Sequence, residues 1–300
     1  MARILSTGIV TLDHIIDAAR FPSEDHEVRG QRWQTRVGGN AANTAQLLAR
    51  RGHDAWLACC VPTGTSGDDL IEHLNRAGVQ VVAERVAGTA PTSMILRTPP
   101  AHRTVVHVRD LPEASATVWD TIDTTLVDAF HFEGRNVDVL RALLNRAIQS
   151  RIDQPIFLEL EKPRVGLIDL AAYADVAMIS RAFVTSAEIQ HMGWPQAPES
   201  FLDAWRQRER SSGRDREWSP IVTLTWGREG AWLDTGKERF HRAPSPDLTI
   251  IDAVGAGDAF NAGLIDALIS GHPPEQALHR AVRLAEAKLG VDGFDLPPDA

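Results

Sequence analysis

The chain contains 300 residues, of which 43% are hydrophobic and 24% are charged, and its formal net charge is −9 at pH 7. This composition supports a sizeable hydrophobic core and excludes both a disordered chain and a small scaffold held by disulfides. The excess of acidic residues argues against a general nucleic-acid binder, because such proteins need a clustered basic face.

Short apolar runs alternate with segments of helical periodicity along the chain. We expect strands at Ile4–Val10, Ala55–Val61, Ala129–Phe132, Ile156–Leu160, Val176–Ile179, Ile221–Thr225 and Ala231–Asp234. We expect helices at Ala41–Arg51, Asp68–Ala77, Val137–Ser150, Ala182–His191, Glu199–Glu209, Ala256–Ser270 and Pro274–Leu289. This alternation predicts an α/β fold with a doubly wound, mostly parallel sheet covered by helices on both faces.

Two stretches interrupt this alternation and predict a second, smaller sheet. Residues 26–37 and 92–110 show strand-like alternation without a helix between strands. Thr92–Arg97 and Thr104–Val108 flank a short proline-containing turn, as the two strands of a hairpin do. We therefore expect a single domain over residues 1–300, with a β lid built from about residues 14–37 and 90–110.

The cysteines and the N-terminus bear on location. Cys59 and Cys60 are adjacent within an apolar run, and adjacent cysteines form a disulfide only with strain. We expect two buried thiols in a reducing cytoplasm. The first eight residues lack the shape of a signal peptide, and no apolar run reaches the roughly 20 residues of a membrane span. Neither a membrane nor a nucleic acid is an expected partner.

The strongest functional signal lies where a β-type run, Leu248–Asp252, leads through a turn of small residues into a helix. The turn Gly255-Ala256-Gly257 offers bare backbone N–H groups at a helix N-terminus, an arrangement that binds phosphate oxygens. Asp258 follows directly and would repel a phosphate there. A carboxylate in this position makes sense if it accepts the proton of an attacking hydroxyl. The alternative interpretation is a favourable charge at a helix start.

Polar residues near the N-terminus form a second signal. The glycines of Gly38-Gly39-Asn40 allow the backbone to approach a ligand closely. Asn40 and Asn43 share one face of the following helix start, where their amides can bind sugar hydroxyls. An N-cap and a solvated side chain explain the two asparagines equally well. Asp13 follows the first strand, where open α/β sheets bind ligands, although a solvated turn residue is the alternative.

Taken together, these segments resemble the PfkB (ribokinase-like) family of carbohydrate kinases. Its two hallmark regions correspond to Gly38-Gly39-Asn40 and to the segment from Asp252 to Asp258. Within the family the chain is similar to the ketohexokinase branch over nearly its whole length. The matching stretches are Phe21–Arg29, Gln31–Trp33, Gly38–Asn43, Arg103–Val106, Leu111–Pro112, Glu133–Asn136, Glu161–Arg164 and Gly293–Asp295.

The resemblance implies transfer of the γ-phosphate of ATP, brought with Mg²⁺, to a ketohexose hydroxyl. The favoured reaction is conversion of fructose to fructose 1-phosphate. Carried over residue by residue, the resemblance makes Asp258 the catalytic base and assigns the anion hole to the backbone of Gly255, Ala256 and Gly257. The sugar-binding residues that it implies are Asp13, Gly39, Asn40 and Asn43. The nucleotide-binding residues that it implies are Arg103, Gly227, Arg228, Glu229 and Gly230.

Two departures from the family pattern concern ions. Ser180-Arg181-Ala182-Phe183 stands where many members carry the Asn-x-x-Glu motif that organises magnesium, so the protein ligands of the metal stay unknown. Ala253 stands where many members carry threonine. If a monovalent cation such as K⁺ binds there, one side-chain ligand is missing.

Other functions remain open on this basis. The acceptor could be another sugar, a nucleoside, a sugar acid or a sugar phosphate. The last two would need an additional cation near the sugar, whereas Asp13, Asn40 and Asn43 form a neutral-to-negative set. A sugar-binding regulator that has lost catalysis is a further alternative. The retained Asp258 and its turn argue against it, because sugar binding alone needs no phosphoryl cradle.

The predicted lid also bears on assembly. Met94 and Leu96 on one strand and Val106 and Val108 on the next place apolar side chains on one face. An isolated hairpin is marginally stable in water, and an exposed apolar strand face favours association. We therefore expect a homodimer through the lid, as the resemblance also implies. The alternative is a monomer whose lid folds onto its own active site.

Overall fold

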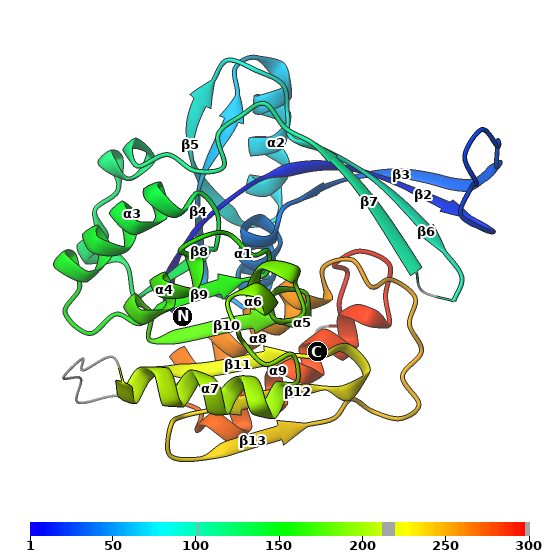
Figure 1. Cartoon of the computed structure of the whole chain (residues 1–300). Helices are drawn as coiled ribbons and strands as arrows, with labels where there is room; N and C mark the ends of the chain where they lie inside the picture. The colour runs from blue at the N-terminus through cyan, green and yellow to red at the C-terminus, as the bar shows by residue number, and fades with distance from the viewer. Residues whose placement is uncertain (101, 212–219, 298–300) are drawn as a thin grey trace.

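The computed structural model describes residues 1–100, 102–211 and 220–297 (Figure 1). Within these residues, nine strands form the main sheet. From edge to edge they are β13 (Arg239–Arg242), β12 (Ala231–Asp234), β11 (Ile221–Thr225), β10 (Val176–Ser180), β9 (Ile156–Leu160), β8 (Ala129–Glu133), β1 (Arg3–Thr7), β4 (Asp54–Pro62) and β5 (Val79–Val86). All the strands run parallel except β12 and β13, which pair antiparallel at one edge.

Helices cover both faces of this sheet, so the doubly wound α/β expectation is confirmed. One face packs against α1 (Asn40–Arg50), α2 (Thr65–Arg76), α8 (Ala256–Ile269) and α9 (Pro274–Leu289). The other packs against α3 (Val137–Ser150), α4 (Leu167–Leu170), α5 (Arg181–Val184), α6 (Ala187–His191) and α7 (Pro198–Ser211). None of these described helices is long and apolar enough to cross a membrane.

Local sequence explains why individual elements form where they do. In α3, Asn136 caps the first turn, and Leu140, Leu143, Leu144 and Ala147 repeat at the spacing that buries one helix face. Every residue of β8 and β9 is buried, which accounts for their near-continuous apolar character, since strands of a parallel sheet are covered on both sides.

The strand order predicts a ligand site at the carboxyl ends of the strands, near the middle of the sheet. The chain adds β4 and β5 on one side of β1 and then returns to add β8, β9, β10 and β11 on the other. The order therefore reverses between β1 and β8. In open α/β sheets, ligands bind outside the carboxyl ends of the strands at such a switch point.

Four further strands of the described chain form a separate sheet, which we call the lid sheet. Its order is β3-β2-β6-β7, with β2 and β6 parallel and the outer pairs antiparallel. The strands are β3 (Gly30–Gly38), β2 (Thr11–Ala18), β6 (Thr92–Thr98) and β7 (His102–Val108). They extend from the main body as an arm (Figure 1). They fall within or close to the ranges expected from sequence, and residue 101 lies outside the described residues.

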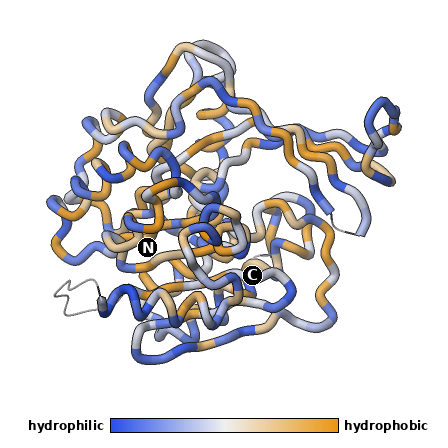
Figure 2. Tube along the Cα trace, viewed as in Figure 1, coloured by the Kyte–Doolittle hydropathy of each residue, from blue (hydrophilic) through white to orange (hydrophobic). Residues whose placement is uncertain are grey.

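The two faces of the lid sheet differ. Ile15 and Ile95 on the inner face are 1% and 4% exposed, whereas Met94, Val106 and Trp33 on the outer face are 45%, 61% and 65% exposed. Apolar stretches run along the lid strands in Figure 2. The outer face is thus apolar, and Met94, Val106 and Trp33 on it are left exposed by the described part of the chain.

Two strands differ from expectation. The first strand ends at Thr7 rather than Val10, and β2 begins at Thr11, so Asp13 lies inside a lid strand rather than in a turn. The expected β-type run Leu248–Asp252 is not a strand, although it lies within the described chain. The backbone N–H groups of Ile251 and Asp252 both donate to the Leu289 carbonyl oxygen, so this segment follows the end of α9 instead of a neighbouring strand.

Other corrections concern element boundaries. The helix expected over Ala182–His191 is two short helices, because Ser180 caps α5 and Ser186 caps a new start for α6. The edge strands β5 and β13 were not expected from the sequence. Cys59 and Cys60 are buried and free, as expected.

Candidate active site

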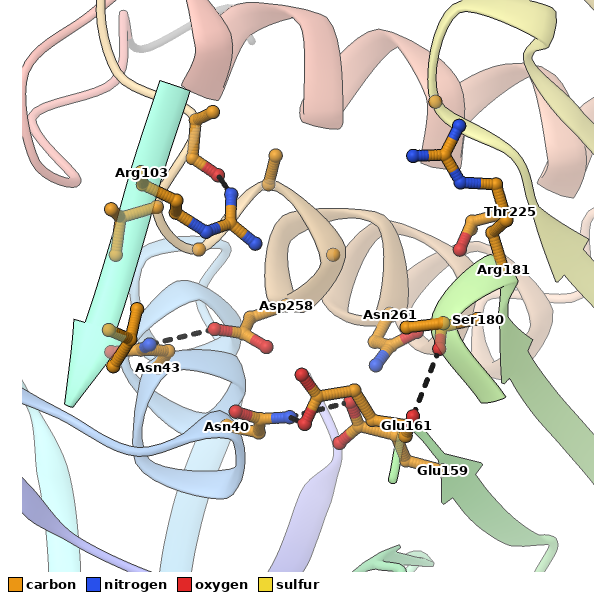
Figure 3. Close-up of a pocket in the computed structure, with 18 of the residues that line it drawn as sticks. Asn40, Asn43, Arg103, Glu159, Glu161, Ser180, Arg181, Thr225, Asp258 and Asn261 are labelled. Carbon is orange, nitrogen blue, oxygen red and sulfur yellow. Dashed lines mark hydrogen bonds between the residues drawn. The ribbon is translucent and has the colours of Figure 1, made fainter. Parts of the chain in front are cut away.

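A cavity of about 800 Å³ lies at the carboxyl ends of the strands, between the start of α8 and the inner face of the lid sheet (Figure 3). It brings together most of the residues singled out from the sequence. These are Asp13, Gly39, Asn40, Asn43, Arg103, Gly227, Arg228, Glu229, Gly255, Ala256, Gly257 and Asp258. Gly230 instead packs against the backbone, where an added Cβ would lie 2.1 Å from the Arg242 carbonyl oxygen.

The turn before α8 presents backbone to the cavity. Gly255 adopts a φ of 83°, in the left-handed region that favours glycine, and an added Cβ there would meet the Phe294 ring at 2.5 Å. A Cβ added to Gly257 would meet nothing within 4 Å. The first N–H groups of a helix have no partner inside the helix. Because residues 255–257 line the cavity, the turn can receive an anion there.

Asp258 lies in the first turn of α8 and is 6% exposed. Its Oδ2 accepts a hydrogen bond of 2.7 Å from Asn43 Nδ2 (Figure 3). Burial raises the pKa of Asp258 above its ordinary value, the charges of Glu161 and Glu133 raise it further, and the Asn43 bond and Arg103 act in the opposite direction. A carboxylate with a raised pKa is a stronger proton acceptor when ionised.

The two asparagines of α1 have separate partners. Asn43 Oδ1 is buried and has no hydrogen-bond partner in the described ranges, so it can accept from a ligand. Asn40 Nδ2 donates to Glu159 Oε1 at 2.9 Å and to Glu161 Oε2 at 3.0 Å. Asn40 is therefore held by two carboxylates, and Asn43 is held by Asp258.

Glu159 and Glu161 are cavity residues to which sequence reasoning assigned no role. They occupy the end of β9 and the position just after it, and the polar run Glu159–Arg164 after an apolar strand was the available signal. Burial raises the pKa of Glu159 well above its ordinary value, and the neighbouring charges of Asp258, Glu133 and Glu161 add to this. Glu159 Oε2 has no partner among the described residues.

Glycines let Asp13 and the α1 turn approach the cavity. Thr11 Oγ1 donates to Asp13 Oδ1 at 2.8 Å. A Cβ on Gly38 would lie 2.1 Å from Asp13 Oδ2, and a Cβ on Gly39, whose φ is 101°, would lie 2.3 Å from the Ile9 carbonyl oxygen. Any side chain at either glycine would displace these groups.

Glu133, at the end of β8, holds the two sides of the switch point together. Its Oε2 accepts from the backbone N–H of Ile9 at 3.0 Å and of Ala41 at 3.3 Å. Arg135 Nε donates to Glu133 Oε1 at 2.7 Å. A Cβ on Gly8 would lie 2.5 Å from Glu133 Oε2. Glu133 thus positions the start of α1, which carries Asn40 and the residues that follow it.

Arginines border the turn and the far end of the cavity. Arg103, on β7, donates from Nη1 to the Ala253 carbonyl oxygen at 2.8 Å, which brings the lid sheet onto the loop that precedes the turn (Figure 3). Arg181 and Arg228 line the cavity near the ends of β10 and β11. A groove with bare N–H groups and arginines suits a polyphosphate.

Comparison with known proteins agrees with this geometry. The sequence model of the pfkB family carbohydrate kinases matches residues 1–299. Ketohexokinase of Mus musculus is 29% identical over an alignment of 306 positions, which covers 98% of this chain and 98% of that protein. ATP-dependent ribose-1-phosphate kinase of Halopiger xanaduensis is 26% identical, covering 100% of this chain and 96% of that protein. The solved structure of Arabidopsis thaliana ribokinase complexed with ribose and ATP matches at a TM-score of 0.75 and 16% identity, covering 97% and 94% of the two chains.

The chain therefore belongs to the PfkB family of carbohydrate kinases. It is a carbohydrate kinase with a ribokinase-like α/β fold and a lid sheet, and both the family and the fold implied by the sequence motifs are confirmed.

Proposed function

We propose that the protein phosphorylates a neutral ketohexose, with the C1 hydroxyl of fructose as the preferred acceptor and fructose 1-phosphate as the product. The observation that carries this proposal is the buried Asp258, hydrogen-bonded to Asn43 beside a turn of bare N–H groups. The similarity to mouse ketohexokinase along 98% of both chains supports the ketohexose.

The residues around the turn account for phosphoryl transfer. The sugar hydroxyl attacks the γ-phosphorus in line and passes its proton to a carboxylate oxygen of Asp258. As the bond to the β-phosphate oxygen breaks, the N–H groups of Gly255, Ala256 and Gly257 stabilise the charge on the phosphoryl oxygens. ADP and the sugar phosphate are the products. Ile95 on the lid lines the same cavity and excludes water from the acceptor.

The acceptor end of the cavity favours hydroxyl groups. Asp13 supplies carboxylate oxygens that accept hydrogen bonds, and Asn43 Oδ1 is an open acceptor. Arg135 also lines this region, but its charge is neutralised by Glu133 at 2.7 Å. The balance is neutral to negative, which suits an uncharged polyol.

The magnesium ion that accompanies ATP fits the end of β9. Glu159 Oε2 is an orphaned buried oxygen and Glu161 lies beside it, both facing the cavity (Figure 3). The described residues contain no group of three or more metal-ligating side chains. Mg²⁺ commonly binds one or two carboxylates together with substrate phosphates and water. Bound here, the ion would neutralise phosphate charge. The two glutamates would replace the motif that is missing at Ser180–Phe183.

A second candidate is an acceptor that carries a carboxylate or a phosphate. His107 on the lid and Lys162 after β9 both line the cavity. Burial lowers the pKa of His107, and the positive charges of Arg109, Lys162 and Arg135 lower it further. His107 therefore stays neutral at pH 7, and Glu113 and Glu133 neutralise Arg109 and Arg135. The ammonium of Lys162 is the positive charge that this end of the cavity offers to an anionic sugar.

A panel of acceptors tests both candidates. ADP release is measured by a coupled assay with fructose, other ketoses, aldoses, sugar acids, sugar phosphates and nucleosides. We expect the highest kcat/KM with fructose and a product phosphorylated at C1 by phosphorus NMR. A higher kcat/KM with an anionic sugar would favour the second candidate. Absence of ADP release above the hydrolysis rate with every acceptor would indicate a sugar-binding regulator.

The proposal extends to assembly and location. The apolar outer face of the lid sheet, with Met94 and Val106 exposed, supports a homodimer in which two lid sheets cover each other. The family match over residues 1–299 supports one catalytic domain for the whole chain. The free, buried thiols of Cys59 and Cys60 support a reducing, cytoplasmic location.

A further inference from the structure

Asp252, which precedes the turn, is saturated with nitrogen donors. Its Oδ1 accepts from the Val254 N–H at 3.0 Å and lies 3.1 Å from Arg97 Nη1. Its Oδ2 accepts from Arg36 Nη1 at 2.7 Å and from the Gly293 N–H at 3.2 Å. Arg36 and Arg97 come from lid strands β3 and β6. Two arginines from one sheet and two backbone N–H groups therefore fix this carboxylate.

Lys288, in the last turn of α9, completes this set of donors. Its side chain is fully buried, and its Nζ lies 3.1 Å from the Asp252 carbonyl oxygen and 3.2 Å from Oδ2. The same Nζ lies 5.6 Å from the centre of the Phe294 ring, which covers Gly255. Burying an ammonium group is costly unless it is paired, so this lysine must be compensated where it lies.

The monovalent cation that the family resemblance allows does not fit beside Asp252. Such an ion needs several oxygen ligands, but the carbonyl and both carboxylate oxygens of Asp252 already face nitrogen donors. Ala253 offers no side-chain oxygen, and its carbonyl oxygen accepts from Arg103 at 2.8 Å. The space that an ion would share with Asp252 holds the Lys288 ammonium.

We propose that Lys288 is a built-in cation that holds the loop leading into the anion-binding turn, so that phosphoryl transfer in this protein does not depend on K⁺. Lys288 is not among the residues that line the cavity, so it is a positioning residue. Its ammonium bonds to the Asp252 backbone two residues before Val254, from which the chain enters the turn. This inference rests on the proposed role of residues 255–257 as the anion hole.

The first test uses the wild-type protein in potassium, sodium and choline chloride at equal ionic strength. We expect kcat/KM with the best acceptor of the panel to agree within about twofold among the three salts. We also expect the midpoint of thermal unfolding to be the same in all three. Activation of tenfold or more by K⁺, or a rise of the midpoint seen only in K⁺, would overturn the proposal. The unfolding measurement needs no acceptor, so it decides even if no sugar is phosphorylated and the proposed function fails.

The second test removes the ammonium. In Lys288→Ala we expect kcat to fall tenfold or more with little change in the KM for sugar, because the turn is displaced while the acceptor side chains stay in place. Ammonium or methylammonium chloride should restore part of kcat, which a purely structural defect would not allow. The matched control is Lys237→Ala, which removes an exposed lysine and should behave as wild type. A Lys288→Ala protein with wild-type kcat in choline chloride would refute the proposal. If this variant fails to fold, the wild-type salt series still decides.

Discussion

At the scale of single residues, Asp258 and Asp138 form an informative pair. Both are aspartates in the first turn of a long helix, but Asp258 is buried beside the anion-binding turn and Asp138 is exposed. Asp258→Asn should lower kcat by about 10²–10⁴, the usual contribution of a positioned base. ADP affinity should stay within a few-fold. Steady-state kinetics and calorimetric titration with ADP would measure the two quantities.

Asp138→Asn is the control, because it removes only a favourable charge at a helix start. Such charges contribute roughly 0.3–1 kcal/mol to stability and nothing to catalysis. If the two variants had similar kcat values, Asp258 would be a helix-start charge and the assignment of the base would be lost.

The charges around Asp258 predict opposite shifts of the pH profile. The base must be ionised, so kcat/KM falls as the pH falls through the pKa of Asp258. Glu161 raises this pKa and Arg103 lowers it. At saturating magnesium, Glu161→Gln should move the acidic limb to lower pH, and Arg103→Gln should move it to higher pH, each by roughly half a unit to one unit.

The pH at the midpoint of the acidic limb is the quantity to compare among the variants, because a uniform loss of kcat does not change it. Glu188→Gln, on the exposed face of α6, should leave the limb where it is. Shifts in the same direction for the two cavity variants would show that another group governs the profile.

Residue types with a local signature were predictable, and long-range partners were not. The Asp258 turn and the Asn40–Asn43 segment are visible because their chemistry lies within a few neighbouring residues. The contact of Asn40 with Glu159 joins positions 119 apart, and no periodicity encodes it. Lys288 is basic in the last turn of a helix, where the helix dipole alone explains a lysine, so only tertiary packing shows that it is buried.

At the scale of elements, β8 carries a pH-dependent contribution to stability. His131 is fully buried, 3.1 Å from Ser6 Oγ on β1, and burial lowers its pKa to about 3. The unfolded chain protonates at its ordinary pKa near 6.5. The contribution of His131 to the free energy of unfolding is therefore complete above that pH and is lost as the pH falls toward 3. The loss is roughly 2 kcal/mol between pH 7 and pH 5.

Denaturant unfolding at several pH values would measure this loss. His131→Gln should flatten the decline between pH 7 and pH 5 relative to wild type, because glutamine does not titrate. His279→Gln, an exposed histidine on α9, should keep the wild-type decline. Equal declines in all three proteins would mean that His131 does not couple protonation to unfolding.

Elements with a strong apolar or helical period were predictable within a few residues, including β9, β11, β12, α3 and α9. The strands β5 and β13 were not predicted, and the strand predicted at Leu248–Asp252 was wrong, each for a physical reason. In β5, Glu84 and Arg85 interrupt the alternation because an edge strand tolerates charge. In β13, Phe240 is flanked by exposed polar residues, so no period exists. Leu248–Asp252 has strand-like composition, but its backbone pairs with the end of α9.

At the scale of the whole molecule, the exposed outer face of the lid predicts the oligomeric state. Met94 and Val106 are directly opposite on β6 and β7, and both are exposed on this face. Light scattering on a sizing column should give twice the chain mass of 32.9 kDa for the wild type. Met94→Glu with Val106→Glu should shift this toward the monomer, because four carboxylates would meet across a two-fold contact. The KM for sugar should rise as the lid loses its support.

Val165→Glu controls for a new surface charge, since Val165 is 93% exposed and lies outside the lid sheet. It should leave both the mass and the KM unchanged. A wild-type mass near 32.9 kDa at micromolar concentration would reject the dimer and favour a lid that serves its own site.

The overall architecture was predictable because strand–helix alternation leaves few topologies for a parallel sheet. The lid was predictable as a small sheet but not in its order, since β2 and β6 pair in parallel across 80 residues of chain. Composition and pattern do not specify which distant strands become neighbours.

The lid arginines also link the two ligand sites thermodynamically. Arg36 on β3 and Arg97 on β6 form ion pairs with Asp252, and Arg103 on β7 donates a hydrogen bond to the Ala253 carbonyl oxygen. The lid holds part of the sugar and the turn holds the nucleotide. Binding of each ligand therefore favours the same arrangement of lid and turn. Linkage is reciprocal: sugar should tighten ADP binding by the same factor by which ADP tightens sugar binding. Arg97→Met should reduce both factors together, which calorimetric titrations in each order would detect. Independent binding in the wild type would show that lid and turn move separately.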